Sequence, residues 1–237
     1  MVHIAVLDTY IDSGKRERKN GKKVYHYKIK RKKVILDRKR KKGKQLNHGT
    51  ICYQILSDNT RDLNYVLHCI EVIPSNGKKG NIKNLIIALE WCLENNIQII
   101  SLSIGTRDVL DGEQLKPIID KLYKNGVIII AAFNNSYTMT YPATFDNVIG
   151  VCVDANEGFL TNTYTYIENN NIGIDVIVQY NLKNTEEIMG IHIGQYNSYA
   201  VPLMTSKILR MKIVAPYISS RNVRYYLKNL AQENRKV

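Results

Sequence analysis

The chain has 237 residues, of which 44% are hydrophobic and 23% are charged. This length and composition indicate a globular protein with room for one packed core. No stretch approaches the roughly 18 consecutive apolar residues of a membrane helix. The first apolar run, Val2–Leu7, is too short for a secretory signal and has no basic residues before it.

The net charge of +13 is concentrated in one segment. Residues 15–44 contain 17 Lys and Arg against two acidic residues, Glu17 and Asp37, whereas the remainder has 17 basic and 19 acidic residues. Alternation over residues 24–30 and the apolar run 34–36 predict a short hairpin with charged faces. The segment is either a solvated surface excursion or a docking surface for an acidic peptide, nucleic acid or anionic lipid.

Outside this segment, apolar strands alternate with amphipathic helices over the first two thirds of the chain. The predicted strands are Ile4–Leu7, Leu67–Ile73, Ile97–Ile104, Val127–Ala132 and Val148–Val153. The predicted helices are Ile51–Leu56, Asn81–Asn95 and Glu113–Asn125. Near-continuous apolar strands of this kind predict a three-layer α/β fold, with a mostly parallel twisted sheet and helices on both faces.

The last third is more polar. It has strand candidates at Asp175–Val178 and near Ile188–Ile193, a helix from Ser198 to about Ile213, and a closing helix that starts near Ser220. Val223, Tyr226, Leu227 and Leu230 fall on one face of the closing helix. The chain has no internal repeat and no break in composition. It is therefore expected to form a single domain over residues 1–237, with a basic surface insertion at about residues 15–44.

The four cysteines lie singly within apolar stretches, without a paired Cys-x-x-Cys spacing. They are Cys52, Cys69, Cys92 and Cys152. This distribution predicts reduced, buried thiols in a cytoplasmic protein. It gives no support to a metal site, and no cofactor is expected.

Polar residues stand where the predicted strands end or the predicted helices begin: Asp8, His48, Ser103, Asn135 and Ser198. Each has an ordinary structural interpretation when taken alone. An Asp can start a turn, a His can be a satisfied structural residue, and a Ser can cap a helix. For Ser198 the helix cap is favoured by Pro four residues later, expected in the first helical turn.

Taken together, six short motifs carry a resemblance to the subtilisin-like serine proteases, the subtilases. They follow one another in the chain order that is typical of that family. The motifs are Val6–Asp12, Asn47–Thr50, Ile100–Gly105, Ala131–Asn135, Tyr141–Ala143 and Asn197–Pro202. The resemblance runs from Ile4 to about Leu230. Together the motifs are specific, although each motif alone is a weak signal.

The resemblance implies a subtilisin-like serine endopeptidase. Ser198 would be the nucleophile, His48 its general base, and Asp8 the group that orients the imidazole. The oxyanion would be bound by the Asn135 side chain and the Ser198 backbone N–H, or by Asn134 if the alignment shifts by one residue. Substrate-binding residues would lie on the matched strand and loops: Ser101, Leu102, Ser103, Ile104, Gly105, Ala132, Phe133, Asn134, Thr140 and Tyr141.

The chain departs from the family pattern at several glycine positions. Tyr196-Asn197 stands where the family usually has Gly-Thr, and Asn134 stands where Gly usually precedes the oxyanion asparagine. Thr9-Tyr10 follows the aspartate where Ser/Thr-Gly is common. Because Gly permits backbone angles that most residues avoid, these changes are expected to alter the shape and depth of the cleft.

Three functions are carried forward as hypotheses. The first is a minimal cytoplasmic peptidase without a signal or prosegment. It would process a limited set of peptides, for example by leader removal, and an acidic region of the substrate could dock on Lys15–Lys44. The second is a catalytically silent peptide-binding module with the same fold. The third is a basic nucleic-acid-binding protein, for which no DNA- or RNA-binding motif is present. No membrane span is expected.

Overall fold

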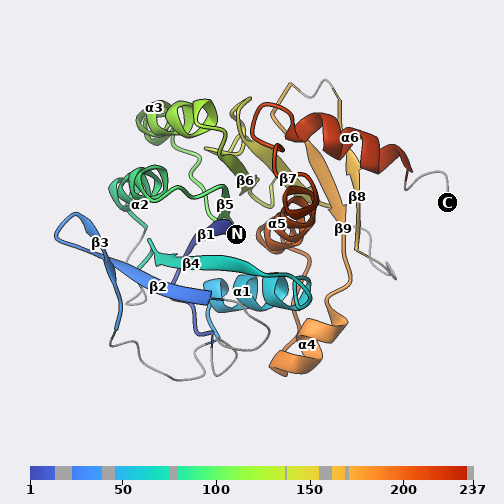
Figure 1. Ribbon diagram of the computed structural model, residues 1–237, viewed down its shortest axis with the longest axis horizontal. Helices are drawn as coiled ribbons and strands as arrows, with labels where there is room; N and C mark the ends of the chain where they lie inside the picture. The colour runs from blue at the N-terminus through green and yellow to red at the C-terminus, as the bar shows by residue number, and fades with distance from the viewer. Residues whose placement is uncertain are drawn as a thin grey trace.

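The computed structural model describes residues 1–13, 23–38, 46–74, 80–136, 138–154, 162–168 and 171–233. Within these ranges the chain forms one nine-stranded sheet with helices on both faces, as Figure 1 shows. The strands are β1 Val2–Asp8, β2 Lys23–Lys30, β3 Lys33–Leu36, β4 Tyr65–Glu71, β5 Ile99–Leu102, β6 Ile128–Ala132, β7 Ile149–Val153, β8 Thr163–Tyr166 and β9 Val176–Gln179. The helices are α1 His48–Asp58, α2 Ile82–Glu94, α3 Val109–Lys124, α4 Lys183–Met189, α5 Asn197–Val214 and α6 Val223–Glu233.

The strand order is β3-β2-β4-β1-β5-β6-β7-β9-β8. The seven strands from β2 to β9 in this order are parallel, and β3 and β8 run antiparallel to their neighbours at the two edges. The predicted three-layer, mostly parallel architecture is confirmed.

Alternate residues of the central strand β1 enter two separate apolar cores. Ile4 and Val6 join the core with Leu56 of α1 and Leu203 of α5. Their neighbours Ala5 and Leu7 join the core on the opposite face, which contains the buried residues of α2 and α3. Burial on both faces explains why these strands are apolar throughout.

The described part of the basic segment belongs to the sheet itself. β2 pairs in parallel with β4, from Lys23 opposite Val66 to Lys28 opposite Glu71. It also pairs antiparallel with β3, which confirms the predicted hairpin. The segment is thus more than a surface excursion, because it supplies two strands at one edge. Residues 14–22 and 39–45 lie outside the described residues.

The strand expected near Ile188–Ile193 is wrong, because Ile188 and Met189 are the last two residues of α4, Lys183–Met189, and residues 190–193 are irregular. The Asn181 side chain accepts a hydrogen bond from Lys183 N at the start of this helix. Gly190 ends it in the left-handed conformation, at φ 68°. The hydrogen bond from Lys183 N and the C-terminal glycine favour this short helix despite its Ile188.

Two helix details also differ from expectation. Pro202 is the sixth residue of α5 and so lies beyond the first turn, and Ser198 is its second residue rather than its cap. Leu230 of α6 remains 38% exposed, whereas Val223 and Leu227 are buried as expected.

All four cysteines are free and buried, as predicted. No helix among the described residues is long and apolar enough to span a bilayer.

Candidate active site

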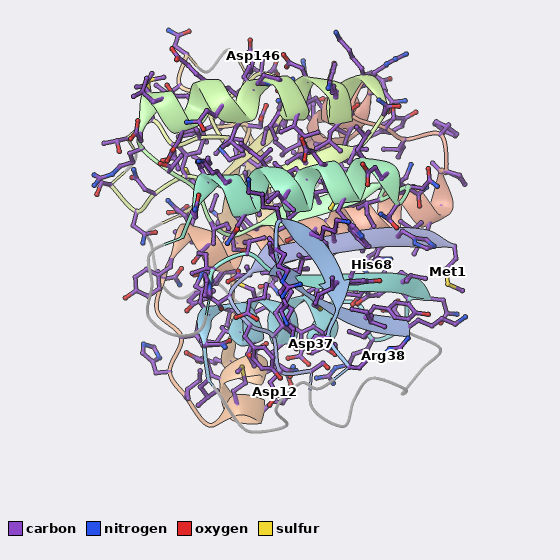
Figure 2. All side chains as sticks on the ribbon, turned by 90° about the vertical axis from the view of Figure 1, so that its left-hand side faces the viewer. Met1, Asp12, Asp37, Arg38, His68 and Asp146 are labelled. Atoms are coloured by element: carbon purple, nitrogen blue, oxygen red, sulfur yellow. The ribbon has the colours of Figure 1, made fainter. Side chains whose placement is uncertain are left out.

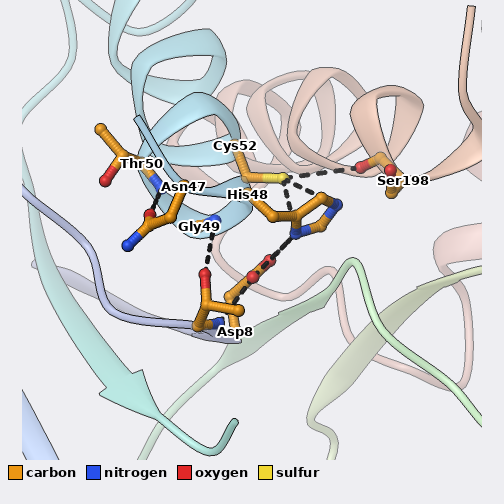
Figure 3. A network of polar contacts seen from close by, with 8 residues as sticks. Asp8, Asn47, His48, Gly49, Thr50, Cys52 and Ser198 are labelled. Atoms are coloured by element: carbon orange, nitrogen blue, oxygen red, sulfur yellow. Dashed lines mark hydrogen bonds and ion pairs between the residues drawn. The ribbon is translucent and has the colours of Figure 1, made fainter. Parts of the chain in front are cut away.

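Asp8 and His48 meet at the carboxyl edge of the sheet, as Figure 3 shows. Asp8 is the last residue of β1 and is completely buried. His48 opens α1, whose start is fixed by Asn47, because the Asn47 side chain accepts a hydrogen bond from Thr50 N at 3.0 Å. His48 Nδ1 lies 2.8 and 3.0 Å from the two oxygens of the Asp8 carboxylate. A proton shared here leaves Nε2 as the free base of the ring.

Gly49 allows this close approach of α1 to the end of β1. Its backbone N–H donates to Thr9 Oγ1 at 2.9 Å. A Cβ at this position would lie 2.7 Å from the backbone oxygen of Thr9 and 3.0 Å from Ile11. Only glycine therefore fits between the helix and the segment that carries Asp8.

Cys52 lies one helical turn after His48 and contacts both His48 and the nucleophile candidate. Its sulfur is 3.9 Å from His48 Nδ1 and 3.9 Å from the backbone oxygen of Ser198. The Ser198 carbonyl is available because its partner in a regular helix would be the N–H of residue 202, which is Pro202. The Cys52 thiol thus donates to the Ser198 carbonyl oxygen, which Pro202 leaves without a helical N–H partner.

The charge state of His48 is set mainly by Asp8. Burial disfavours the charged ring, but negative charge at Cys52 and the hydrogen bond to Asp8 favour it, and the net effect raises the pKa of His48. Burial in turn raises the pKa of the Cys52 thiol. Because that thiol is therefore neutral near pH 7, Asp8 is the group that raises the pKa of His48 there.

Ser198 lies at the positive end of the α5 dipole, where backbone N–H groups favour a developing negative charge. Tyr199 stacks on the His48 ring with centroids 5.6 Å apart. No hydrogen bond between His48 and the Ser198 hydroxyl is present in the described structure. The Asp8–His48 pair is formed, and Ser198 lines the same cleft.

Asn135 and Asn134 have clearly different surroundings. The Asn135 side-chain oxygen accepts from Asn197 N at 3.0 Å, which leaves the Asn135 amide nitrogen available to donate. The Asn134 side chain bonds within its own loop, where its oxygen accepts from Ser136 N and Thr138 N. The geometry therefore favours Asn135 over Asn134 as the oxyanion donor.

Asn197 ties this loop to the start of α5. It is completely buried. Its side-chain oxygen accepts from Val153 N at 2.7 Å, and its side-chain nitrogen donates to the backbone oxygen of Asn134 at 2.8 Å. Asn197 thus joins the end of β7, the loop that contains Asn134 and Asn135, and the start of α5.

A cleft of about 420 Å³ brings most of the predicted site together. Its lining is His48, Ser103, Ile104, Gly105, Ala132, Phe133, Asn134, Asn135, Thr140, Tyr196, Ser198 and Tyr199. Ser101 and Leu102 are buried inside β5, and Ser101 bonds Thr205 of α5. Tyr141 packs on Phe145, and its backbone pairs with Thr106. These three residues were predicted as substrate-binding, and they do not line the cleft.

Sequence reasoning missed Cys52, the hydrogen bonds of the Asn197 side chain and Tyr199 in the cleft wall, whereas it expected Tyr196 to alter the cleft. Cys52 could have been found, because four residues after His48 is one turn of the same helix face. Among the described residues, Asp8, His48 and Cys52 are the group whose ligand atoms lie close enough to hold a metal ion, within 4.8 Å of one another. An ion there would take the atoms that already join Asp8 to His48.

A second hollow of about 210 Å³ shares Ile104 and Gly105 with the cleft. It is also lined by Val72 and Ile73, which follow β4, and by Ile82 at the start of α2. The two hollows are therefore neighbours at the carboxyl edge of the sheet, and together we call them the trough.

Comparison with known proteins places this geometry in a family, because the model of the subtilase family matches residues 1–236. The chain belongs to the subtilases. Subtilisin DY of Bacillus licheniformis is 34% identical over 101 residues, which cover 40% of this chain and 36% of that relative. Subtilisin BL of Lederbergia lenta is 25% identical over 169 residues, covering 70% of this chain and 60% of that relative. The match thus spans only about a third of the length of subtilisin DY.

Solved structures show the same fold at low sequence identity. A psychrophilic protease, S41, gives a TM-score of 0.68 at 16% identity, covering 96% of this chain and 82% of that one. The nisin leader peptidase NisP from Lactococcus lactis gives 0.65 at 13% identity, covering 94% and 81%. A lanthipeptide protease gives 0.60 at 13% identity, covering 94% and 78%. Below 25% identity these likenesses concern the fold alone.

Proposed function

We propose that this subtilase is a serine endopeptidase that processes a limited set of peptides, for example by removing a leader segment. One observation carries the proposal: the buried Asp8 carboxylate holds His48 Nδ1 at 2.8 Å beside a cleft that Ser198 and Asn135 also line. Two proteins that share the fold are a nisin leader peptidase and a lanthipeptide protease, which supports leader removal as the reaction.

The mechanism follows from the residues around the cleft. His48 Nε2 takes the proton of the Ser198 hydroxyl as its oxygen attacks the scissile carbonyl, and His48 then returns that proton to the leaving amine. Asp8 keeps the proton of the other ring nitrogen and stabilises the imidazolium. The oxyanion accepts hydrogen bonds from the Asn135 amide and the Ser198 N–H. Water then releases the acyl group by the same route.

The substrate is proposed to lie extended along the trough that starts at Ser198. The cleft and the second hollow share Ile104 and Gly105, so a peptide backbone can follow β5 outward as an added strand. An acidic region of the same substrate is proposed to bind the basic segment Lys15–Lys44. A cytoplasmic site of action is also proposed, since free buried thiols such as Cys152 are typical of reducing compartments.

The test is cleavage of a peptide library by the wild-type chain and by Ser198→Ala, with products identified by mass spectrometry. The proposal predicts defined cleavage sites for the wild type and none for the variant. Cleavage that survives the substitution contradicts the mechanism.

A second candidate function is a catalytically silent peptide-binding module. The observation that favours it is the absence of a hydrogen bond between His48 and the Ser198 hydroxyl in the described structure. In the same experiment this candidate predicts peptide binding to both proteins and cleavage by neither.

A further inference from the structure

The tip of the β2–β3 hairpin stands at the same edge of the sheet as the catalytic residues. Asp8 of β1 is paired with Glu71 of β4, and Glu71 is paired with Lys28 of β2. Two strand spacings, about 10 Å, therefore separate the rows of Asp8 and Lys28. β2 continues past this row to Lys30, so the turn that follows projects beyond the active-site edge. Figure 1 shows the hairpin extending from the body of the protein, and in Figure 2 it faces the viewer.

The trough leads from the cleft toward this hairpin. The second hollow begins at Ile104 and Gly105, which it shares with the cleft, and ends against Val72 and Ile73 just after β4. β4 is the direct neighbour of β2 in the sheet. An extended peptide adds about 3.3 Å per residue, so a peptide held in the cleft reaches the hairpin within a few residues.

The tip consists of four consecutive cations, Lys30–Lys33, which we call the cationic tip. All four side chains are exposed, and none of them has an ion-pair partner within the described ranges. Lys28 differs from them, because it is neutralised by Asp37 at 2.7 Å. Four adjacent cations of the same charge repel one another, and an acidic ligand relieves that repulsion.

The backbone of the cationic tip is unfavourable for the residues it carries. Lys30 pairs with Lys33 across the hairpin, so Arg31 and Lys32 form a two-residue turn. They adopt φ values of 50° and 59°. Asn-Gly is the preferred sequence for a turn with two positive φ angles, and residues with long side chains pay a steric cost there. The chain therefore has Arg31 and Lys32 where an Asn-Gly pair would form the turn with less steric strain. Strain that is kept at such a position points to a function of the two charges.

We infer that the cationic tip binds an acidic segment of the peptide substrate, and that it holds this segment while the cleft cuts a few residues away. The inference rests on the proposed peptidase function and adds a substrate class to it: peptides with an acidic block close to the cleaved bond. A peptide is favoured over a nucleic acid because the tip flanks the peptide trough and contains no aromatic side chain on which a base could stack. β3 is also an edge strand, with Ile35 and Leu36 exposed, so its backbone can form hydrogen bonds with the backbone of the same substrate peptide.

The decisive variant is Arg31→Asn with Lys32→Gly. It removes two charges and gives the turn its preferred sequence, so its melting temperature should equal or exceed that of the wild type. The matched control is Lys121→Gln with Lys124→Gln, which removes two exposed cations from the end of α3. That end precedes β6 and therefore lies at the opposite edge of the sheet.

The substrates are two synthetic peptides with one cleavable segment, flanked at both ends by four Glu or by four Gln. In about 50 mM NaCl the wild type should cleave the Glu peptide with a kcat/KM about fivefold higher, the effect expected of two surface ion pairs. The ratio should fall clearly in the hairpin variant, which keeps Lys30 and Lys33, and to about one in about 500 mM NaCl, and it should persist in the control variant. A ratio that is unchanged in the hairpin variant overturns the inference and leaves the peptidase proposal intact.

Binding is measured separately, so that the two proposals can fail independently. Fluorescence anisotropy of the labelled Glu peptide is followed with Ser198→Ala, with and without the two hairpin substitutions. Weaker binding in the combined variant supports the inference even if the wild type cleaves neither peptide. Equal binding overturns it. A labelled single-stranded oligonucleotide that binds more tightly than the Glu peptide, and loses this affinity in the combined variant, assigns the tip to nucleic acid and also overturns the inference.

Discussion

Replacing Asn197 by Ala should damage both the stability and the active site of this subtilase. The buried Asn197 side chain satisfies Val153 N at 2.7 Å and the Asn134 carbonyl at 2.8 Å. The substitution removes the side-chain acceptor of the buried Val153 N–H, and loss of such a hydrogen bond costs about 1–3 kcal/mol. The Asn134 carbonyl belongs to a half-buried residue that water can reach, so its loss should add only about 1 kcal/mol. The total of about 2–4 kcal/mol corresponds to about 5–15 °C in melting temperature.

The assay is urea unfolding followed by circular dichroism, together with peptide cleavage. Asn84→Ala is the matched control, because the side chain of the half-buried Asn84 makes one long hydrogen bond, 3.4 Å from its Nδ2 to Val72 O. Its loss should be offset by the higher helix propensity of Ala. Since the Asn197 side chain also holds the Asn134 carbonyl, next to Asn135, kcat should fall more than KM changes in Asn197→Ala. An Asn197→Ala protein within about 0.5 kcal/mol of the wild type would refute the reasoning.

Three further predictions concern the reaction and its geometry. Asn135→Ala should lower kcat by about 10²–10³ with little change in KM, as expected for a donor used only in the transition state; an unchanged kcat would exclude that role. Catalysis needs neutral His48, whose pKa is raised above 6.5, so kcat/KM should fall as pH decreases through a midpoint above 6.5, and Asp8→Asn should move the midpoint down. The contribution of the Asp8–His48 ion pair to folding stability should be fully present below pH 6.5 and be lost as pH rises through the raised pKa of His48. A midpoint of the kcat/KM profile at or below pH 6.5 would contradict both statements, because both depend on the raised pKa. Gly49→Ala should cost stability and activity together, because its Cβ would lie 2.7 Å from Thr9 O beside Asp8; circular dichroism and cleavage assays would detect either loss.

Much of the fold could be predicted because the strands are buried on both faces. The runs Val127–Ala132 and Val148–Val153 contain no charge and are followed within two residues by polar side chains, a pattern typical of buried parallel strands. α4 was missed because its seven residues carry too little periodicity to outweigh the apolar spacing of Ile188, Ile191 and Ile193. Its Thr185 side chain also bonds Asp58, which lies far away in sequence.

The site was predictable where a residue type and its place in an element coincide. Asp8 ends a strand and His48 opens a helix, so local pattern placed both at the ends of elements, and the resemblance to the subtilases supplied their expected roles. Ser101 and Leu102 could not be assigned, because whether a residue of β5 lines the cleft depends on how α5 packs against it. The contact of Cys52 with Ser198 O likewise depends on two helices that are 146 residues apart in sequence.

The central claim is that Ser198 is a nucleophile activated by His48. The most direct measurement is labelling of the native chain with a fluorophosphonate, followed by peptide mapping with mass spectrometry. One adduct on Ser198 is predicted, together with its loss on unfolding and in His48→Ala. An unlabelled Ser198 in the folded chain, or labelling that does not depend on His48, would contradict the claim.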